Sequence, residues 1–157
     1  VITEFLAAPG TINDSDGEYL ELFNPTAFPV NLRDWVMRDD GGNLHTIAAD
    51  VIVPPQGFVV LARNANDSMN GGLGADYQWS NFALSSTDQI IFEAAGILIE
   101  QFVYTGNMGS GGRSANLDPD FLDAVANDDP LRWCSTSTAQ LADGDFGTPG
   151  APNEQCP

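Results

Sequence analysis

The sequence predicts an all-β protein, an immunoglobulin-like antiparallel β-sandwich of about eight to nine short strands. Three observations support this prediction. Short segments rich in branched and aromatic residues recur along the chain, turn signals separate them about every 8–12 residues, and helical patterns are scarce. With 157 residues, of which 43% are hydrophobic, the chain can bury a substantial core, and we expect a single domain spanning residues 1–157.

The segment 17–25, Gly-Glu-Tyr-Leu-Glu-Leu-Phe-Asn-Pro, is the best-defined strand. Its aromatic and aliphatic side chains favour a pleated sheet, and the final Asn-Pro ends the strand because proline cannot donate to a ladder. Alternation places Leu20 and Leu22 on one face and Glu21, between two aromatic residues, on the other. Both faces carry large apolar groups, so we expect a central strand that is covered on both sides.

Glu21 is expected to be buried and paired. An isolated carboxylate is costly to bury, and arginine forms planar, bidentate pairs. We therefore predict that a strand arginine pairs with Glu21 and that the pair is structural. The candidates are Arg33, Arg38, Arg63 and Arg113.

The remaining strands are predicted, in chain order, at 2–7, 30–38, 44–47, 51–53, 58–62, 89–93, 97–104 and 113–117. Asp-Asp-Gly-Gly-Asn at 39–43 and Pro-Pro-Gln-Gly at 54–57 are turn signals, and Ala-Ala-Gly at 94–96 joins a hairpin. The Gly- and Asn-rich stretch 64–80 is predicted to be the longest loop. Asp-Pro at 118–119 favours one or two helical turns.

Two facing sheets are expected to bury Leu20, Leu22, Trp35 and Val60 between them. Trp35 lies in strand-like sequence and is interpreted as a core residue. The stretch 143–153 has no periodicity and is expected to lie extended on the sandwich.

The charge of the chain excludes some partners. There are 22 acidic residues against five arginines and no lysine, which gives a formal net charge of −17. Phosphate backbones and anionic lipids need local positive charge, so we expect no direct nucleic-acid binding. No apolar run is long enough to span a bilayer. We interpret the acidic residues as a solvated surface. Such a surface would also be expected in a protein that stays soluble in a salty medium, where salt screens the repulsion between like charges.

Cys134 and Cys156 are the only cysteines. In an acidic β protein rich in Asn, Gly and Pro, this pair predicts a disulfide and an oxidising compartment, whereas two free thiols would indicate the cytosol. Closing the loop between them would contribute roughly 3 kcal/mol in the chain-entropy model. We therefore expect a secreted protein or a cell-surface protein.

Calcium is the cofactor for which the sequence offers ligands. Alternate acids before and after a glycine, Asp14, Asp16 and Glu18, could supply oxygens from a tight loop. The segment lacks the ligand pattern of an EF-hand, because Ile12 and Phe23 occupy positions that need oxygen donors. A second acidic group is present at 118–129. The alternative for both is turn and cap chemistry, in which Asp bonds its own backbone.

Aromatic residues suggest a binding role for the long loop. Tyr77 and Trp79 lie in it and Phe82 follows it, and with neighbouring Asn and Asp they could stack on sugar rings. The alternative is that Trp79 and Phe82 anchor the loop to the core. A protein or carbohydrate ligand is expected, and the sequence leaves the oligomeric state open.

No catalytic residues are assigned. His45 is the only histidine, and no nucleophile-elbow motif surrounds any serine, so a triad is not indicated. Paired carboxylates are present by number alone and carry no information. The sequence predicts that the chain is not an enzyme.

Five motifs together resemble the bacterial form of the lamin tail domain. They are Gly-Glu-Tyr-Leu-Glu-Leu-Phe-Asn-Pro at 17–25, Val-Asn-Leu-Arg-Asp-Trp at 30–35, Pro-Pro-Gln-Gly-Phe-Val-Val-Leu-Ala-Arg at 54–63, Gly-Arg-Ser at 112–114, and Gly-Thr-Pro-Gly-Ala-Pro-Asn at 147–153. The first and the last are the most specific. The resemblance spans nearly the whole chain and implies an immunoglobulin-like β-sandwich, in agreement with the strand pattern.

The resemblance implies a modest function. Bacterial lamin-tail-like domains look like accessory modules of secreted or surface proteins that mediate binding or attachment, and they are often joined to nucleases, phosphatases or proteases. A non-catalytic extracellular module is therefore expected. The alternative is an accessory fragment of a secreted nuclease or phosphoesterase whose catalytic residues lie elsewhere in a parent chain. The coiled-coil rod and basic localisation segment of animal lamins are not found in residues 1–157, so no nuclear filament role is implied.

Overall fold

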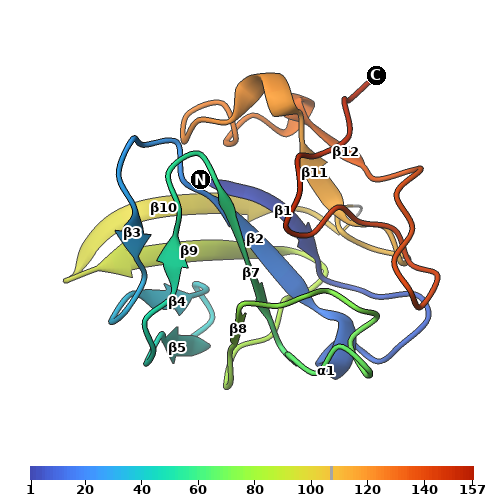
Figure 1. Cartoon of the computed structure of the whole chain (residues 1–157), viewed down its shortest axis with the longest axis horizontal. Coiled ribbons are helices and arrows are strands. Elements are labelled where there is room, and N and C mark those ends of the chain that lie inside the picture. Colours follow the sequence, from blue (N-terminus) through green and yellow to red (C-terminus); the bar gives the residue numbers. More distant parts are fainter. Residues whose placement is uncertain (107) are drawn as a thin grey trace.

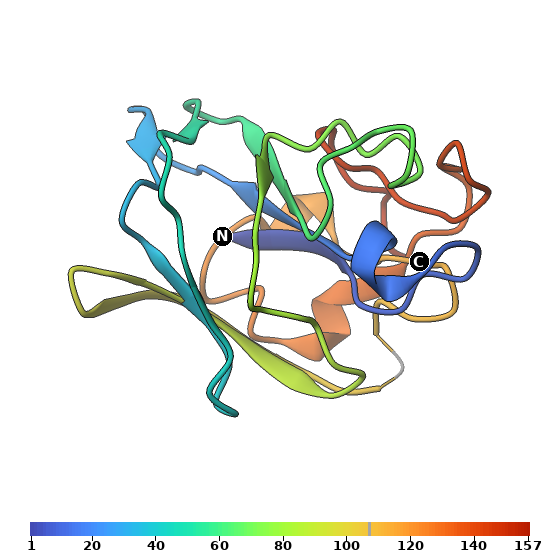
Figure 2. The same cartoon turned by 90° about the horizontal axis from the view of Figure 1, so that it is seen from below.

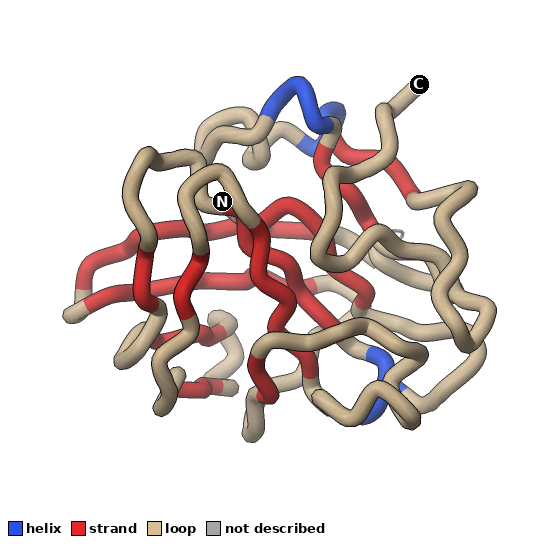
Figure 3. The backbone as a smooth tube through the Cα atoms, in the orientation of Figure 1, coloured by secondary structure: helices blue, strands red, loops and turns tan. Residues whose placement is uncertain are grey.

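A computed structural model of the chain describes residues 1–106 and 108–157. It is an all-β sandwich, which confirms the predicted fold class (Figure 1). One sheet has the order β12-β11-β1-β2-β7-β8, the second has the order β10-β9-β4-β5, and β3 and β6 form a short third ladder. Figure 3 shows how little helix accompanies these strands.

The elements are short. The strands are β1 (Ile2–Leu6), β2 (Tyr19–Phe23), β3 (Val30–Asn31), β4 (Val36–Arg38), β5 (Leu44–Thr46), β6 (Ile52–Val53), β7 (Phe58–Ala62), β8 (Tyr77–Gln78), β9 (Asp88–Ala94), β10 (Ile97–Tyr104), β11 (Ala115–Leu117) and β12 (Trp133–Ser135). The helical turns are α1 (Asp14–Gly17), η1 (Pro119–Phe121) and η2 (Pro130–Arg132). In the described ranges, no helix has the length and hydropathy that a membrane crossing requires.

The strand β2 is central, as its sequence predicts. It pairs with β1 on one side and with β7 on the other, and all five of its residues are buried. Leu20 and Leu22 point into the main core between the two large sheets, whereas Tyr19 belongs to a second cluster on the opposite face. Apolar residues on both faces of β2 are favourable here because each face of the sheet packs against its own hydrophobic cluster.

The expectation for Val60 is wrong. In the antiparallel register Val60 lies opposite Glu21, and Val59 and Leu61 lie opposite the two inward leucines. Directly opposed residues share a face. Val60 therefore packs in the second cluster, with Tyr19, and does not lie between the sheets.

The outer face of the six-stranded sheet is covered by loops. Leu73 from the long loop and Leu141 from the C-terminal segment pack against the second cluster. Figure 2 shows these segments on the side of the sheet that faces away from β9 and β10. The C-terminal segment lies on the sandwich, as expected, but it is not extended throughout, because backbone bonds from Gly144 to Leu141 and from Ala151 to Thr148 close two turns. The disulfide between Cys134 and Cys156 ties its end to β12, which confirms the predicted pairing.

Aromatic side chains fill the core beneath β10. Phe102 stacks on Trp133 with ring centroids 4.4 Å apart, and Phe5 lies 4.5 Å from Tyr104. These contacts join the two large sheets, since Phe5 and Trp133 come from one and Phe102 and Tyr104 come from the other. Buried aromatic pairs of this kind contribute area and specific ring geometry.

Several short elements differ from the sequence predictions. The stretch 11–17, expected to be loop, contains the single helical turn α1, the predicted loop 64–80 contains β8, and neither η2 nor β12 was expected. The strand predicted at 30–38 is interrupted by a turn and forms β3 and β4, which belong to different sheets. The predicted turns after Asp118 are present as the 3-10 turn η1, whose first position is proline and whose cap is the Asp118 carboxylate, which accepts from the backbone of Asp120 at 2.9 Å.

Candidate binding site

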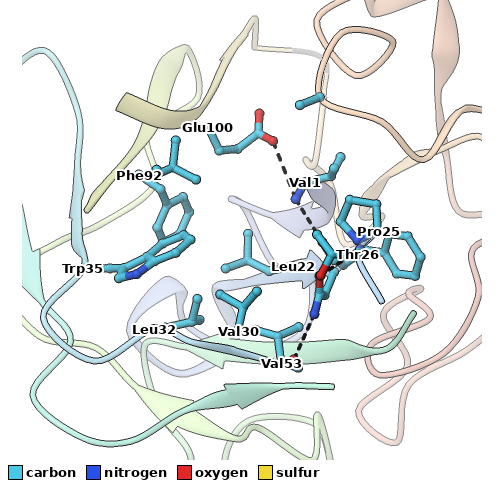
Figure 4. A pocket seen from close by; sticks show the side chains of 14 residues that line it. Val1, Leu22, Pro25, Thr26, Val30, Leu32, Trp35, Val53, Phe92 and Glu100 are labelled. Atoms are coloured by element: carbon cyan, nitrogen blue, oxygen red, sulfur yellow. Dashed lines mark hydrogen bonds and ion pairs between the residues drawn. The ribbon is translucent and has the colours of Figure 1, made fainter. Parts of the chain in front are cut away.

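An apolar cleft opens at one end of the sandwich, where β3, β9 and β10 meet the start of the chain. Its volume is about 220 Å³. Figure 4 shows Trp35 and Phe92 on one side of the cleft, Leu32, Val30 and Val53 along the adjoining side and Leu22 between them, with Pro25 and Thr26 across from Trp35. Most of the exposed lining is therefore hydrocarbon, which water solvates poorly.

A tight turn delivers Trp35 to this cleft. Asp34 has φ 65°, in the left-handed region that Asp tolerates better than most residues. The backbone N–H of Trp35 donates to the carbonyl of Leu32 at 3.0 Å, which closes the turn. Both Leu32 and Trp35 then line the cleft, with Leu32 fully buried and Trp35 only partly buried. The core assignment of Trp35 is thus correct in part, because its side chain packs against the main core but stays partly exposed.

The cleft has one ionisable wall residue, Glu100. Its side chain is 6% exposed, and Asn127 donates to it at 3.0 Å. The backbone nitrogen of Val1 lies 3.6 Å from the other carboxylate oxygen. Burial raises the pKa of Glu100 above its ordinary value. A polar group at the edge of an apolar cleft can orient a ligand that carries a hydrogen-bond donor.

Apolar residues that line the cleft, or that flank its lining residues in the chain, are exposed. Ile99 lines it and is 45% exposed. Phe28, Ile52 and Val125 are at least half exposed, and each is within two residues of a lining residue in the chain. Burial of such groups against a partner would remove apolar surface from water, which is favourable.

The predicted aromatic pair does not form an exposed platform. Trp79 is 1% exposed, lies in the main core and donates from its indole nitrogen to the carbonyl of Phe82 at 2.9 Å. The anchoring alternative is therefore correct for Trp79, and stacking of a sugar on it is excluded. The hydroxyl of Tyr77 lies 2.8 Å from Nε2 of His45 and accepts from the backbone of Ala48 at 3.2 Å.

A polar depression of about 700 Å³ lies above Trp79. Its walls include Arg63, Gln78 and Asn81, whose amide and guanidinium groups could bond hydroxyls. It offers no exposed aromatic face, since Trp79 and Phe82 are both buried. We therefore favour the apolar cleft as the binding site.

The predicted calcium ligands are drawn into other contacts. Asp14 is exposed, Asp16 accepts from Asn64 at 2.8 Å, and Glu18 is buried. Glu18 binds the guanidinium of Arg63 at 2.8 Å, and burial raises its pKa to about 7 in spite of that partner. Among residues 1–106 and 108–157, no group of three or more Asp, Glu, His or Cys side chains is arranged to hold a metal ion. Calcium binding stays a prediction of the sequence.

The second acidic group is used for capping. Asp118 caps η1, Asp129 caps η2 by accepting from Leu131 at 3.0 Å, and Asp123 accepts from two backbone N–H groups of the turn that follows it. These contacts match the turn and cap alternative.

The arginine partner predicted for Glu21 is wrong. Glu21 is fully buried, but it accepts hydrogen bonds from the Thr3 hydroxyl at 2.7 Å and from the backbone of Gly150 at 2.8 Å. The arginines have other partners in the described part of the chain. Arg33 binds Asp50, Arg38 binds Glu93, Arg63 binds Glu18, Arg132 binds Asp129, and Arg113 lies over the ring of Phe146.

A network of neutral donors replaces the arginine. Glu4 lies directly opposite Glu21 and accepts from Tyr19, from Ser114 and from the backbone and hydroxyl of Thr148. Neutral hydroxyls and amides satisfy the carboxyl groups without adding a buried charge. The network is covered by the C-terminal segment, so we regard it as structural.

The cleft could not be found from the sequence. Its lining comes from stretches of the chain as far apart as Val1 and Ala124, and its apolar members have the ordinary signature of core residues. The one usable signal was the tryptophan that follows Leu-Arg-Asp, because an aromatic residue next to a left-handed turn position can be only half covered.

A scan against protein-family models matched the Lamin Tail Domain over residues 1–106. No curated protein and no solved structure matched the chain. The matched range covers most of the strands of both large sheets and ends before β11. It therefore includes all of the residues that line the cleft except Ala124.

Proposed function

Because the chain belongs to the lamin tail domain family, we propose that it is a non-catalytic extracellular binding or attachment module and an accessory domain of a larger secreted or surface protein. In this proposal the apolar cleft takes one apolar side chain of a protein partner. The observation that carries it is the partly exposed Trp35 in a hydrocarbon-lined cleft at the open end of the sandwich.

The size of the cleft favours a side chain over a free small molecule. Its volume of about 220 Å³ is below the range of about 300–1,000 Å³ that small-molecule pockets usually have. It exceeds the roughly 150 Å³ of an engineered cavity that admits benzene. A cleft of this size can therefore take one leucine or phenylalanine side chain. Single apolar side chains of this kind often anchor protein interfaces.

The disulfide supports an extracellular location. The Cys134–Cys156 bond persists in oxidising compartments, and such bonds are uncommon in the cytosol. The net charge of −17 bears on partners and discourages contact with nucleic acids. A role beside the catalytic domain of a secreted hydrolase would use the same module in the same way.

Calorimetric titration with N-acetyl-phenylalanine methylamide tests the cleft. The wild type should bind in the millimolar range or better, and Ile99→Asp should weaken binding at least tenfold, because a carboxylate at the rim opposes burial of an apolar ring. Leu131→Asp is the matched control, since Leu131 is 87% exposed and lies outside the cleft. Equal affinity of the wild type and Ile99→Asp would refute the proposed site.

An activity screen tests the non-catalytic assignment. Residues 1–157 should leave single-stranded and double-stranded DNA, RNA and bis-p-nitrophenyl phosphate intact, with and without added Mg²⁺ or Ca²⁺. Turnover that survives repurification would contradict this part of the proposal.

A further inference from the structure

We propose that β10 is a docking edge, to which an extended, lysine- or arginine-rich segment of a partner protein adds as a further strand. This inference rests on the binding role proposed above and names both the surface and the chemical class of the partner. The docking edge would bind its partner through backbone hydrogen bonds, whereas the cleft would bind through contacts with apolar side chains.

The strand β10 is the one long edge in the described part of the chain. It has eight residues, ends the order β10-β9-β4-β5, and pairs with β9 alone. The other edges of the two large sheets, β5, β8 and β12, have only two or three residues. Apart from the β9 ladder, residues 97–103 make no backbone–backbone hydrogen bond to any described residue. Figure 2 shows the β9–β10 turn reaching beyond the body of the sandwich.

The outer side of β10 has one backbone donor that is used and one that is available. The N–H of Gln101 is bonded at 3.0 Å to the side chain of its own neighbour, Glu100, so it points away from β9 but is already satisfied. In an antiparallel strand the outward N–H groups recur at every second residue. The N–H of Val103 therefore points to the same side and is the donor that a further strand could use.

The second half of β10 lacks the usual protection of an edge strand. Natural edges carry lysine, proline, bulges or inward-pointing charges that prevent further pairing, and the stretch 97–104 has no Lys, Arg, Pro, Gly or Asp. The bulge at Ile99 and the buried Glu100 protect only its first half. Ile97, Leu98 and Val103 are 65%, 54% and 61% exposed. An apolar edge with so little charge is a template for another strand.

The edge and the cleft form one continuous surface. The register between β10 and β9 shifts between Leu98 and Glu100, so that Ile99 is the extra residue of a bulge. Ile99 and Glu100 also line the cleft, as the position of Glu100 in Figure 4 shows. A strand laid along β10 would thus carry its side chains past the mouth of the cleft. Strand addition combined with a side-chain pocket is a common mode of peptide recognition.

Charge selects the partner. A second copy of this chain would bring another net −17 to the interface, and like charges in contact oppose association. Asp128 lies close enough to act on the carboxyl group of Glu100, whereas Glu93, opposite Leu98 on the neighbouring strand, is paired with Arg38. A cationic segment is attracted to the net negative charge of the chain, and long basic side chains keep an extended peptide soluble until it docks.

The probe is a blocked nine-residue peptide in which lysine alternates with valine around one central leucine. It is titrated into ¹⁵N-labelled wild-type protein at 50 mM salt. The largest amide shifts should fall on residues 97–103, and the dissociation constant should rise at least fivefold at 500 mM salt. The same peptide with glutamate in place of lysine should not bind.

Two further arms isolate the backbone contribution. Peptides with alternate amide nitrogens methylated, in the two possible phases, keep their side chains, and the phase that removes the pairing donors should bind at least tenfold more weakly. Val103→Pro removes an outward N–H that the β9 ladder does not use and should weaken binding to the same extent. Val103→Thr is its matched control, since it keeps the N–H. Melting curves check that both variants are folded.

The outcomes separate this inference from the cleft proposal. Equal affinity of both methylated phases, or no peptide shifts on β10 at 1 mM, would overturn strand addition even if the phenylalanine amide still bound the cleft. Concentration-dependent dimerisation of the wild type with shifts on β10 would also overturn it, because the occupant would then be a second copy. If the peptide bound to β10 and N-acetyl-phenylalanine methylamide did not bind at all, the cleft proposal would be refuted and strand addition would stand.

Discussion

Glu4 and Glu21 face each other across the β1–β2 ladder, both without solvent exposure, and the C-terminal segment closes over them. Thr148 donates to one carboxyl group and the backbone of Gly150 donates to the other. The last part of the domain is thus held by two acids that sit side by side. This arrangement has consequences for stability that can be measured.

The first prediction concerns pH. Burial, followed by the charge of Glu4, raises the pKa of Glu21 to about 8, and burial raises the pKa of Glu4 as well. A carboxyl group whose pKa is higher in the folded state holds its proton more tightly there. Its contribution is therefore complete below the unfolded value of 4.5 and falls as the pH rises toward 8. The protein should unfold at lower urea concentration at pH 8.5 than at pH 5.5, in 0.5 M salt to screen surface charge.

Glu21→Gln separates this cause from surface repulsion. The amide keeps the size of the side chain and cannot ionise, so the difference in unfolding free energy between pH 5.5 and 8.5 should shrink by roughly 1–3 kcal/mol. Asp40→Asn, which neutralises an exposed acid, is the control and should leave the difference unchanged. An identical pH dependence in Glu21→Gln and the wild type would show that Glu21 is not the responsible group.

A second prediction concerns Gly147, which packs against the hydroxyl of Tyr19. A methyl group built at this position would overlap that oxygen, and the oxygen is fixed by its hydrogen bond to Glu4. Gly147→Ala should lower the unfolding free energy by about 1–3 kcal/mol. Gly41→Ala is the control, because its new methyl group would meet only ordinary contacts. Chemical denaturation at pH 6 measures both, and a neutral Gly147→Ala would mean that the C-terminal segment is not held against Tyr19.

The third prediction concerns the disulfide. Cys134 and Cys156 are 22 residues apart and join β12 to the end of the C-terminal segment. Replacing both by serine should cost about 3 kcal/mol of unfolding free energy. The intact mass of protein produced in an oxidising compartment should be 2 Da below that of the reduced chain. Two titratable thiols in such protein would argue against the extracellular location.

The fourth prediction distinguishes core from surface aromatics. Trp79 is buried, so Trp79→Ala should cost about 3–5 kcal/mol of stability. Tyr77→Phe removes only the hydroxyl that contacts His45 and Ala48, and should cost about 1 kcal/mol. Thermal melts give both values. A stable Trp79→Ala with impaired ligand binding would restore the loop as a recognition site.

Most strands could be predicted from local sequence patterns. Features that depend on contacts between distant parts of the chain could not. Alternation in residues 19–23 places Leu20 and Glu21 on their correct faces, because that depends only on the pleat. Val60 was assigned to the wrong face because its orientation depends on the register between β2 and β7. The partner of Glu21 was missed for a similar reason, since Gly150 is 129 residues away.

Candidate site residues followed the same division. The cap interpretation of loop acids is correct at Asp118 and Asp129. Capping could be predicted there because it depends only on the backbone N–H group two residues further along the chain. The aromatic loop was misjudged in part, because burial of Trp79 depends on the whole core. The cleft, which is assembled from distant segments, carries no local signature.

The most direct test of the account is an amide chemical-shift map of the wild type with N-acetyl-phenylalanine methylamide. The shifts should centre on Leu32, Trp35 and Ile99, which line the cleft. They should disappear in Ile99→Asp. Shifts that centre instead on Arg63, Gln78 and Asn81, or a spectrum unchanged at millimolar probe, would contradict the assignment of the cleft as the binding site.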